Sequence, residues 1–265
     1  HPNTFIVFPW GPSSLTNRDD DPFVPLILAS RALFGMAGLV HYDDFLANAP
    51  PGSRWRKAQD HLVRINMGCD ASLLPCRKPD APRPTGLLHV SSLRRYKKPE
   101  LMLESLPAEG CDLYIGTKRM DIIAELAAKG LMKRNVHVLG AIDNADPGAN
   151  RFILEKCAYY LHTSGEAQAT TILENCARGL VPLLTPRSGF SSPDVIFLTE
   201  NPEENQEIIR GALAMSDEEY AARSRNLRQH VRQYHSWDRI CQYMYVTIRA
   251  LMAGQDVDRR GEEYS

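Results

Sequence analysis

The amino-acid sequence predicts an α/β fold with a doubly wound parallel sheet, and two features of its hydropathy pattern lead to this prediction. Short apolar runs alternate with amphipathic stretches along most of the 265 residues. The apolar runs lack the clean alternation of a half-exposed strand, which indicates strands that are covered on both faces. Helical stretches separate several of these runs, and that order is typical of a parallel sheet built from β-α-β units.

The individual elements follow from the same pattern. The expected strands are FIVF (5–8), GLVHY (38–42), LVRI (62–65), GLLHV (86–90), DLYIG (112–116), VHVLG (136–140), YYLH (159–162), VPLLT (181–185) and DVIFL (194–198). The helical patterns between them are 99–106, 118–132, 149–158 and 170–179. In the second, Ile122, Ile123, Leu126 and Leu131 recur near the 3.6-residue period of a helix with one buried face. After residue 200 the pattern is entirely helical, except for a polar tail (253–265) that we expect to fray.

A proline-rich stretch divides the chain. Residues 75–86, PCRKPDAPRPTG, contain four prolines, which fix φ and lack the amide donor that a helix or central strand needs. We therefore expect residues 76–86 to be a linker. Residues 1–75 hold two or three strands, too few to bury a core well, and resemble the end of a larger or reduced domain. A second domain should span 87–235, with a final helix (236–252) that could cross back to the first.

Composition excludes several classes of protein. The net charge is -1 and hydrophobic residues make up 43%, which argues against a disordered chain or a basic nucleic-acid arm. No apolar stretch approaches the ~20 residues of a membrane span, and the first residues lack the features of a signal peptide. We expect a cytoplasmic protein with reduced thiols and no metal, because no C-x-x-C pair occurs among Cys69, Cys76, Cys111, Cys157, Cys176 and Cys241. The sequence also lacks the G-x-S-x-G and G-x-G-x-x-G motifs of hydrolases and dinucleotide enzymes.

The most informative segment is residues 162–190, HTSGEAQATTILENCARGLVPLLTPRSGF. It combines a strand end, a loop of small residues, a helix that starts near Thr170, a turn at Gly179 and another strand. Ligands of open α/β sheets bind where strands end and helices begin, and helix N-termini favour phosphates. Glu166 in the loop and Glu174 in the helix could accept hydrogen bonds from sugar hydroxyls. Spacing alone favours another interpretation, in which Glu174 is a solvated helix residue and Glu166 an acid that the helix dipole favours at a helix start.

The same segment resembles the donor-site signature of retaining GT-B glycosyltransferases of the family-4, glycogen-synthase-like type. That signature is a strand end, Glu-x7-Glu, a small-Gly turn, an apolar strand and a Gly-containing loop. The corresponding parts here are Thr163-Ser164, Glu166 to Glu174, Arg178-Gly179, VPLLT (181–185) and Ser188-Gly189. Further motifs resemble the family in the right order, namely FIVFPWGPSSL (5–15), RINMGCD (64–70), LLHVSSLRRYKKPELMLESL (87–106) and YHSWDRI (234–240). The ordered set covers residues 3–250 and is more specific than any single motif.

The resemblance implies a GT-B fold with a Rossmann-like C-terminal domain and a partial N-terminal α/β domain. It implies a hexosyl-type transferase of EC class 2.4, which moves a sugar from a nucleotide-diphosphate sugar to a glycan, lipid or other acceptor with retained configuration. Such enzymes generally need no metal or other cofactor, because cations and helix dipoles stabilise the leaving diphosphate. In this sequence Lys97 matches the lysine that contacts the diphosphate, Glu174 the glutamate that binds the ribose, and Glu166 the one beside the donor sugar.

The resemblance also implies roles for other positions of the donor site, two of which depart from the family pattern. The backbone at Ala167, Gln168, Ala169 and Thr170 would face the phosphates or sugar, Ser188 and Gly189 lie in a loop that approaches the donor, and Gly11 and His41 could face the cleft from the N-terminal side. Ser92 stands where the family has an arginine, so Arg94 or Arg95 would have to replace that cation. Ala-Gln-Ala (167–169) stands where Gly-Phe-Gly is usual, which leaves the backbone less free to approach a ligand.

Alternatives remain at this stage. The chain could be a non-catalytic module or subunit that binds a nucleotide sugar and needs a partner for its acceptor half, or a nucleotide-sugar epimerase of similar architecture. Lys97 could be a solvated loop lysine, and His41 a packing residue. The basic run LRRYKK (93–98) is explained by a diphosphate pocket, so we expect no nucleic-acid partner. We expect the basic helix 223–235 to face solvent. The alternative is that it contacts the anionic inner face of a membrane. The base, sugar, acceptor and oligomeric state are not fixed.

Overall fold

The computed structural model describes residues 4–8, 23–48, 51–78 and 81–261. The chain divides into two compact units, each with its own parallel sheet. The first unit comprises residues 1–69, 166–170 and 233–265, and the second comprises 70–165 and 171–232.

The first unit is built on a three-stranded parallel sheet in the order β1-β2-β3. Its strands are β1 (Phe5–Phe8), β2 (Ala32–Met36) and β3 (Leu62–Ile65). Its helices are α1 (Phe23–Ala29), α2 (Leu39–Asn48), α3 (Arg54–Gln59) and α10 (Trp237–Met252). Strand β2 lies in the middle, and all five of its residues are buried.

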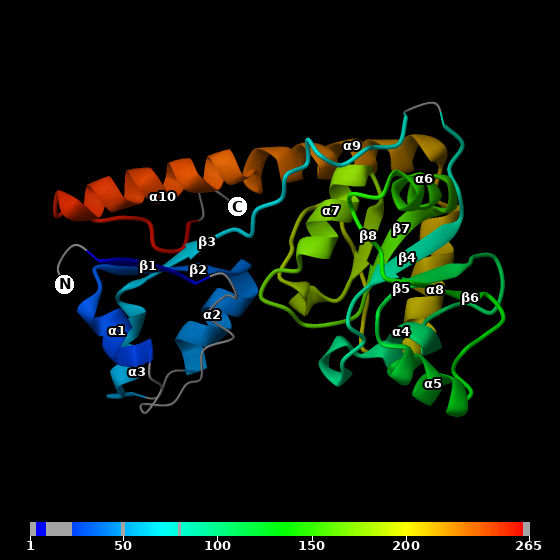
Figure 1. The fold of residues 1–265 in the computed structure, drawn as a ribbon, viewed down its shortest axis with the longest axis horizontal. Helices are drawn as coiled ribbons and strands as arrows, with labels where there is room; N and C mark the ends of the chain where they lie inside the picture. The colour runs from blue at the N-terminus through cyan, green and yellow to red at the C-terminus, as the bar shows by residue number, and fades with distance from the viewer. Residues whose placement is uncertain (1–3, 9–22, 49–50, 79–80, 262–265) are drawn as a thin grey trace. The chain divides into compact units, whose positions relative to one another are not determined.

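Helices cover both faces of this sheet (Figure 1). On one face Val24 of α1, Tyr42 of α2 and Ala58 of α3 pack with Leu33 and Leu62 of the sheet. On the other face the apolar side of α10 packs on the strands, in a cluster made by Phe34, Val63, Ile65, Ile240, Tyr243 and Leu251. The sheet is therefore the middle layer of three.

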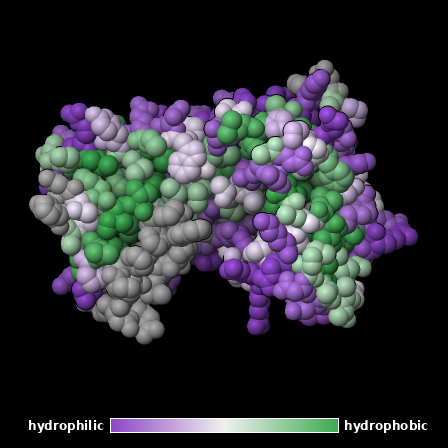
Figure 2. Space-filling view, in the orientation of Figure 1, coloured by the Kyte–Doolittle hydropathy of each residue, from purple (hydrophilic) through white to green (hydrophobic). Residues whose placement is uncertain are grey.

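A hydrophobic area lies over β1 and α1 on the surface of the first unit (Figure 2). Val7 in β1 is 46% exposed, and Leu26 in α1 is 57% exposed. Strand β1 pairs only with β2 in the described sheet, so one of its sides lies at the sheet edge.

Two expectations for the first unit are wrong. Residues 38–42 are not a strand, because α2 starts at Leu39 and the strand is β2, which ends at Met36. Both lie in one apolar run, and a run of this kind does not show by its period where a strand stops and a helix starts.

The second wrong expectation concerns the polar tail. Its residues up to 261 are held against the first unit, since the Arg64 amide donates to the Arg259 carbonyl at 2.8 Å. The buried Arg64 guanidinium also donates to the carbonyls of Ala37 at 3.0 Å and Gly261 at 2.8 Å.

The second unit contains a six-stranded parallel sheet in the order β6-β5-β4-β7-β8-β9. The strands are β4 (Gly86–Val90), β5 (Leu113–Gly116), β6 (Val136–Gly140), β7 (Cys157–His162), β8 (Val181–Leu184) and β9 (Ile196–Phe197). The strands run outward from β4 in one direction and then from β7 in the other, which is the Rossmann strand order. The predicted doubly wound sheet is thus confirmed, with Leu87 of β4 paired to Leu113 on one side and Tyr159 on the other.

Helices follow the strands of the second unit. They are α4 (Pro99–Glu104), α5 (Met120–Ala128), α6 (Pro147–Lys156), α7 (Thr170–Arg178), α8 (Pro202–Ala214) and α9 (Asp217–Tyr234), with short 3-10 turns η2 (Arg95–Lys97) and η3 (Pro186–Ser188). The sequence determines several of their starts. Asp146 and Asn201 accept hydrogen bonds from the first free amides of α6 and α8, and a proline follows each cap.

The centre of the second sheet is closed to water. All residues of β7 and β8 are buried, which explains why their sequences read as continuous apolar runs rather than as alternating ones. Of the six free cysteines, four are buried, Cys76 is partly buried and Cys241 is exposed. Within the described ranges, no helix has both the length and the apolar character needed to cross a bilayer.

Candidate functional site

The candidate site lies in the second unit, where the strand order reverses between β4 and β7. In open α/β sheets the crevice at this point, outside the carboxyl ends of the strands, binds the ligand. Three loops start there: 91–98 after β4, 163–165 after β7 and 185–189 after β8. They carry Ser92, Arg94, Arg95, Lys97, Ser188 and Gly189, which the sequence predicts to be donor-site residues.

The loop after β4 has a strained backbone. Leu93 and Lys98 both have φ of 50°, and they are the two non-glycine residues with positive φ in the part of the chain that the structure describes. This conformation is costly for side chains with a Cβ and persists where surrounding contacts enforce it. The Leu93 amide donates to Ser91 Oγ at 3.0 Å, and Thr163 Oγ1 lies 3.2 Å from the carbonyl oxygens of both Lys97 and Lys98. The loop after β7 therefore holds the loop after β4 in place.

Lys97 is the buried cation of this loop. Its side chain is only 8% exposed, and Nζ lies 5.0 Å from the centre of the Tyr96 ring. Burial, and then repulsion by the Arg94 guanidinium, lower the pKa of Lys97 to about 8. Arg94 and Arg95 are exposed. The neighbouring Lys98 is less buried, and its ammonium binds the Glu200 carboxylate at 2.6 Å on the surface. Lys97 is therefore the lysine that an anion at the end of β4 would stabilise.

Two buried histidines lie at the strand ends below the loops. His89 Nε2 is 2.7 Å from Ser91 Oγ, and His162 Nε2 is 2.8 Å from Ser164 Oγ. The two rings stack with centroids 6.3 Å apart. Burial lowers the pKa of His89 to about 4 and that of His162 well below the ordinary value, so both rings are neutral near pH 7. The sequence analysis missed this pair, although the signal is a repeat of His-x-Ser at the ends of β4 and β7.

Glu174 lies in the second turn of α7 and is half-buried. Its charge is close enough to Tyr160 to help burial raise the pKa of that phenol. The Tyr160 hydroxyl is occupied by Thr171 Oγ1 at 2.7 Å and the Val90 carbonyl at 3.2 Å. The Glu174 carboxylate itself has no hydrogen bond or ion pair with another described residue, so it can accept hydrogen bonds from a ligand.

The loop after β8 is tied to the loop after β7. Thr185 Oγ1 donates to the Ser164 carbonyl at 3.0 Å, and a Cβ on Gly165 would lie 3.4 Å from Cβ of Arg187. Ser188 is buried, and Gly189 has φ of 76°, a conformation that favours glycine. The second unit thus brings Lys97, Glu174, Ser188 and Gly189 to one edge of its sheet.

Residues 166–170 belong to the first unit and are held there by polar contacts. The Ala167 carbonyl accepts a hydrogen bond from the Gly38 amide at 2.6 Å, and the side-chain oxygen of Gln168 accepts one from the Met67 amide. Gly38 precedes α2, which contains the buried His41. His41 is therefore a helix residue, and the expectation that it lies at a strand end is wrong. Gly11 lies outside the described residues.

The segments 64–70 and 234–240, which carry two of the family-like motifs, pack on each other in the first unit. The Cys69 amide donates to the His235 carbonyl at 2.7 Å, and Asn66 Nδ2 donates to the Tyr234 carbonyl at 3.1 Å. Gly68 lies under the indole of Trp237, where a Cβ would come within 2.3 Å of the ring. The glycine and tryptophan of these motifs thus have a packing role.

No group of three or more metal-ligating side chains occurs among the residues that the structure describes. Positive charge near the end of β4 comes from Lys97, Arg94 and Arg95 instead. These groups, with the Glu174 carboxylate, could bind a ligand that carries both phosphate and hydroxyl groups.

Comparison with known proteins supports the fold. No protein-family model and no curated protein matches the sequence. Among solved structures, a glycosyltransferase from Rickettsia africae matches with a TM-score of 0.71 at 12% identity, over 94% of this chain and 70% of that one. HepE from Anabaena, solved with UDP and glucose, matches with a TM-score of 0.67 at 13% identity, over 93% and 71%. The catalytic domain of starch synthase IV from Arabidopsis thaliana, bound to ADP and acarbose, matches with a TM-score of 0.64 at 13% identity, over 88% and 58%. The chain therefore has the GT-B fold of glycosyltransferases.

Proposed function

We propose that this protein is a glycosyltransferase that binds a nucleotide-diphosphate sugar at the carboxyl ends of β4, β7 and β8. The observation that carries the proposal is the buried Lys97 ammonium at the point where the strand order reverses. The GT-B fold supports it, and so does HepE, a neighbour of that fold that was solved with UDP-glucose.

The proposed roles follow from the chemistry of each group. Lys97, with Arg94 or Arg95, would offset the charge of the leaving diphosphate, so that side chains rather than a metal stabilise it. The Glu174 carboxylate would accept hydrogen bonds from the ribose hydroxyls. Ser188 and Gly189 would approach the donor from the loop after β8.

The finer assignments rest on the Glu-x7-Glu resemblance. We propose that Glu166 lies beside the donor sugar, that backbone amides of residues 167–170 face the phosphates or the sugar, and that transfer to a glycan, lipid or other acceptor proceeds with retained configuration. The side chain of Gln168 is not part of this proposal, because it binds the Met67 amide.

A thermal-shift panel of UDP-, GDP- and ADP-sugars tests donor binding. A ligand present at 100 times its Kd stabilises the folded protein by about 2.7 kcal/mol. At about 2–4 °C per kcal/mol, that corresponds to a shift of about 5–10 °C. We expect one nucleotide class to give this shift, Glu174→Gln to reduce it to about half or less, and Glu155→Gln on the exposed face of α6 to retain it. The absence of a shift with every nucleotide would contradict the proposed site.

A non-catalytic sugar-nucleotide module is the second candidate. The observations in its favour are Ser92 in place of an arginine and the engagement of Gln168 within the protein. Product analysis with the stabilising donor separates the two candidates, since an enzyme releases free nucleoside diphosphate and a module binds the donor without turnover.

A further inference from the structure

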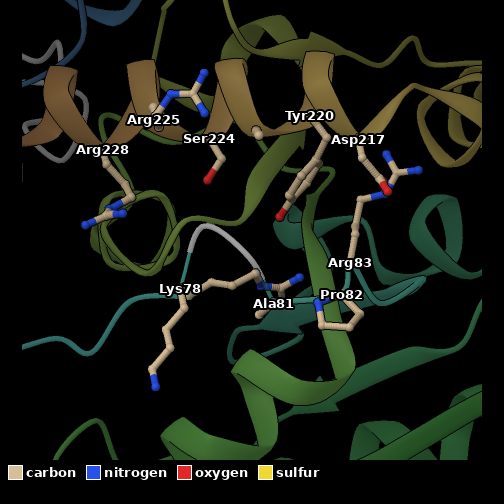
Figure 3. A pocket seen from close by; sticks show the side chains of 11 residues that line it. Lys78, Ala81, Pro82, Arg83, Asp217, Tyr220, Ser224, Arg225 and Arg228 are labelled. Carbon is tan, nitrogen blue, oxygen red and sulfur yellow. The ribbon is translucent and has the colours of Figure 1, made fainter.

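The second unit contains a basic cavity of about 250 Å³ that the proposed function does not use. One wall is the proline-rich linker, with Arg77, Lys78 and Arg83, and the other is α9, with Arg225 and Arg228 (Figure 3). Among the described residues that line it, Asp217 is the one carboxylate. The whole chain has a net charge of -1, so this concentration of cations is local.

The cavity lies at the amino-terminal edge of the sheet, opposite the proposed donor site. Arg77 donates to the carbonyls of Leu154, at 2.8 Å, and of Cys157, the first residue of β7. The Tyr220 hydroxyl lies 3.0 Å from the carbonyls of Ala158 and Gly179, and Gly179 precedes β8. The donor loops start at the other ends of these strands, and a strand of six residues spans about 20 Å. The cavity is therefore a separate site.

Arg83 and Asp217 form an ion pair with each other. Arg83 Nε lies 3.2 Å from the Asp217 carboxylate, and the same guanidinium donates to the Met215 carbonyl at 2.7 Å. It also lies over the Tyr220 ring, 5.3 Å from the ring centre. In Figure 3, Arg83 and Asp217 lie side by side. Asp217 is thus not available to neutralise the remaining cations.

Arg77 and Arg228 have donors without a partner among the described residues. Nε and Nη1 of Arg77 and Nε of Arg228 are buried, and no hydrogen-bond partner for them occurs in the described part of the chain. Buried donors without an acceptor are costly, and like charges that gather in one place repel each other. An anion in the cavity would relieve both costs.

We propose that this cavity binds the phosphoryl group of a small phosphorylated molecule or of a phospholipid headgroup. Guanidinium groups match the geometry of phosphate oxygens, and arginine is the common choice where phosphate is recognised. The side chains of Tyr220 and Ser224 extend from α9 toward the linker residues Ala81 and Pro82 in Figure 3. Their hydroxyls donate to the Gly179 carbonyl, at 3.0 and 2.8 Å, so the cations are the groups that would bind the anion. The volume is below the ~300–1,000 Å³ of pockets for drug-sized ligands, which fits one phosphoryl group with a small substituent.

Isothermal titration with pyrophosphate tests the site in the 265-residue chain that carries Lys97→Met, so that the contribution of the proposed donor site is reduced. We expect Arg228→Ala to weaken binding at least about tenfold, as loss of a charged hydrogen bond does. Arg225→Glu alters an exposed residue, so it should fold and should weaken binding as well. Arg232→Ala, an exposed arginine of α9 outside the cavity, is the matched control and should bind as tightly as the parent.

Flotation with vesicles identifies the source of the phosphoryl group. Binding to phosphatidylglycerol vesicles but not to phosphatidylcholine vesicles, lost in Arg225→Glu and kept in Arg232→Ala, would assign a lipid headgroup. Binding of pyrophosphate without vesicle flotation would assign a soluble ligand. If neither probe binds, or if Arg228→Ala and Arg225→Glu both bind as tightly as the control, the proposal is wrong. Pyrophosphate binding that disappears with Lys97→Met alone would also overturn it.

Discussion

The buried ammonium of Lys97 gives donor binding a pH dependence whose sign and size follow from the structure. Without a ligand, burial lowers its pKa to about 8. A diphosphate in contact with the ammonium favours the charged form and should return the pKa toward the ordinary value of about 10.4. The bound state then holds the proton more tightly than the free state. Affinity is therefore fully present below pH 8 and falls as the pH rises above 8.

The magnitude can be worked from these two pKa values. Binding at pH 7 should take up about 0.1 proton, because the free lysine is already charged, whereas binding at pH 9 should take up about 0.9 proton. The affinity should fall about tenfold between pH 7 and pH 9. Without a ligand the sign is reversed. The folded state loses its proton first, so the protein should gain about 1.4 kcal/mol of stability over the same interval.

Calorimetry measures the proton uptake directly. Titrations of the stabilising nucleotide sugar at pH 9, in two buffers of different ionisation enthalpy, give the number of protons taken up. We expect Lys97→Met to reduce this number to near zero and to remove the loss of affinity above pH 8. Lys98→Gln is the matched control, since Lys98 binds Glu200 at the surface and should leave proton uptake unchanged. Equal heats in both buffers for the parent protein would refute the assignment of Lys97 to the diphosphate.

Three further predictions concern other parts of the molecule. Glu174→Gln should weaken nucleotide-sugar binding roughly 10- to 100-fold, the range for charged hydrogen bonds, while Glu155→Gln leaves the Kd within error. Arg64→Leu removes a buried guanidinium that donates to the carbonyls of Ala37 and Gly261. It should lower the free energy of unfolding in urea by roughly 2–6 kcal/mol, about 1–3 for each carbonyl left without a donor, and expose the 257–261 segment to protease. Gly86→Ala would place a Cβ 2.2 Å from the Lys156 carbonyl and should cost about 1–3 kcal/mol in the same assay. Its control, Gly211→Ala in open space on α8, should stabilise the helix by about 0.5–1 kcal/mol; an equal effect of both changes would contradict the packing argument.

The second sheet could be predicted from the sequence because its strands are short and fully buried, and helices with clear periods separate them. The first sheet was harder. Residues 32–42 form one apolar stretch, and only pairing with β1 and β3 selects Ala32–Met36 as the strand. The tail keeps a defined position because the Arg64 guanidinium donates to the Gly261 carbonyl. Arg64 lies nearly two hundred residues earlier in the chain, so no local pattern predicts this contact.

In the candidate site, too, only residues in local motifs could be predicted from the sequence. Lys97 and Glu174 could be named from motifs, whose spacing is local. The His-x-Ser pairs at residues 89–91 and 162–164 become meaningful only when β4 and β7 are known to be neighbours. The basic cavity combines the linker with α9, and a composition of 31 basic and 32 acidic residues does not reveal such a cluster.

The buried histidine pair also determines how the pH experiment can be interpreted. A histidine that titrated beside Lys97 would change the charge of the site below pH 7 and would blur the effect of the lysine. Burial lowers the pKa of His89 to about 4 and that of His162 well below its ordinary value, so neither ring gains charge in the interval from pH 6 to pH 9. Their neutral rings instead hold the Ser91 and Ser164 hydroxyls, and Ser91 in turn holds the Leu93 amide of the strained loop. The core thus holds Lys97 in a buried position that lowers its pKa, and the change in affinity above pH 8 should come from that single ammonium.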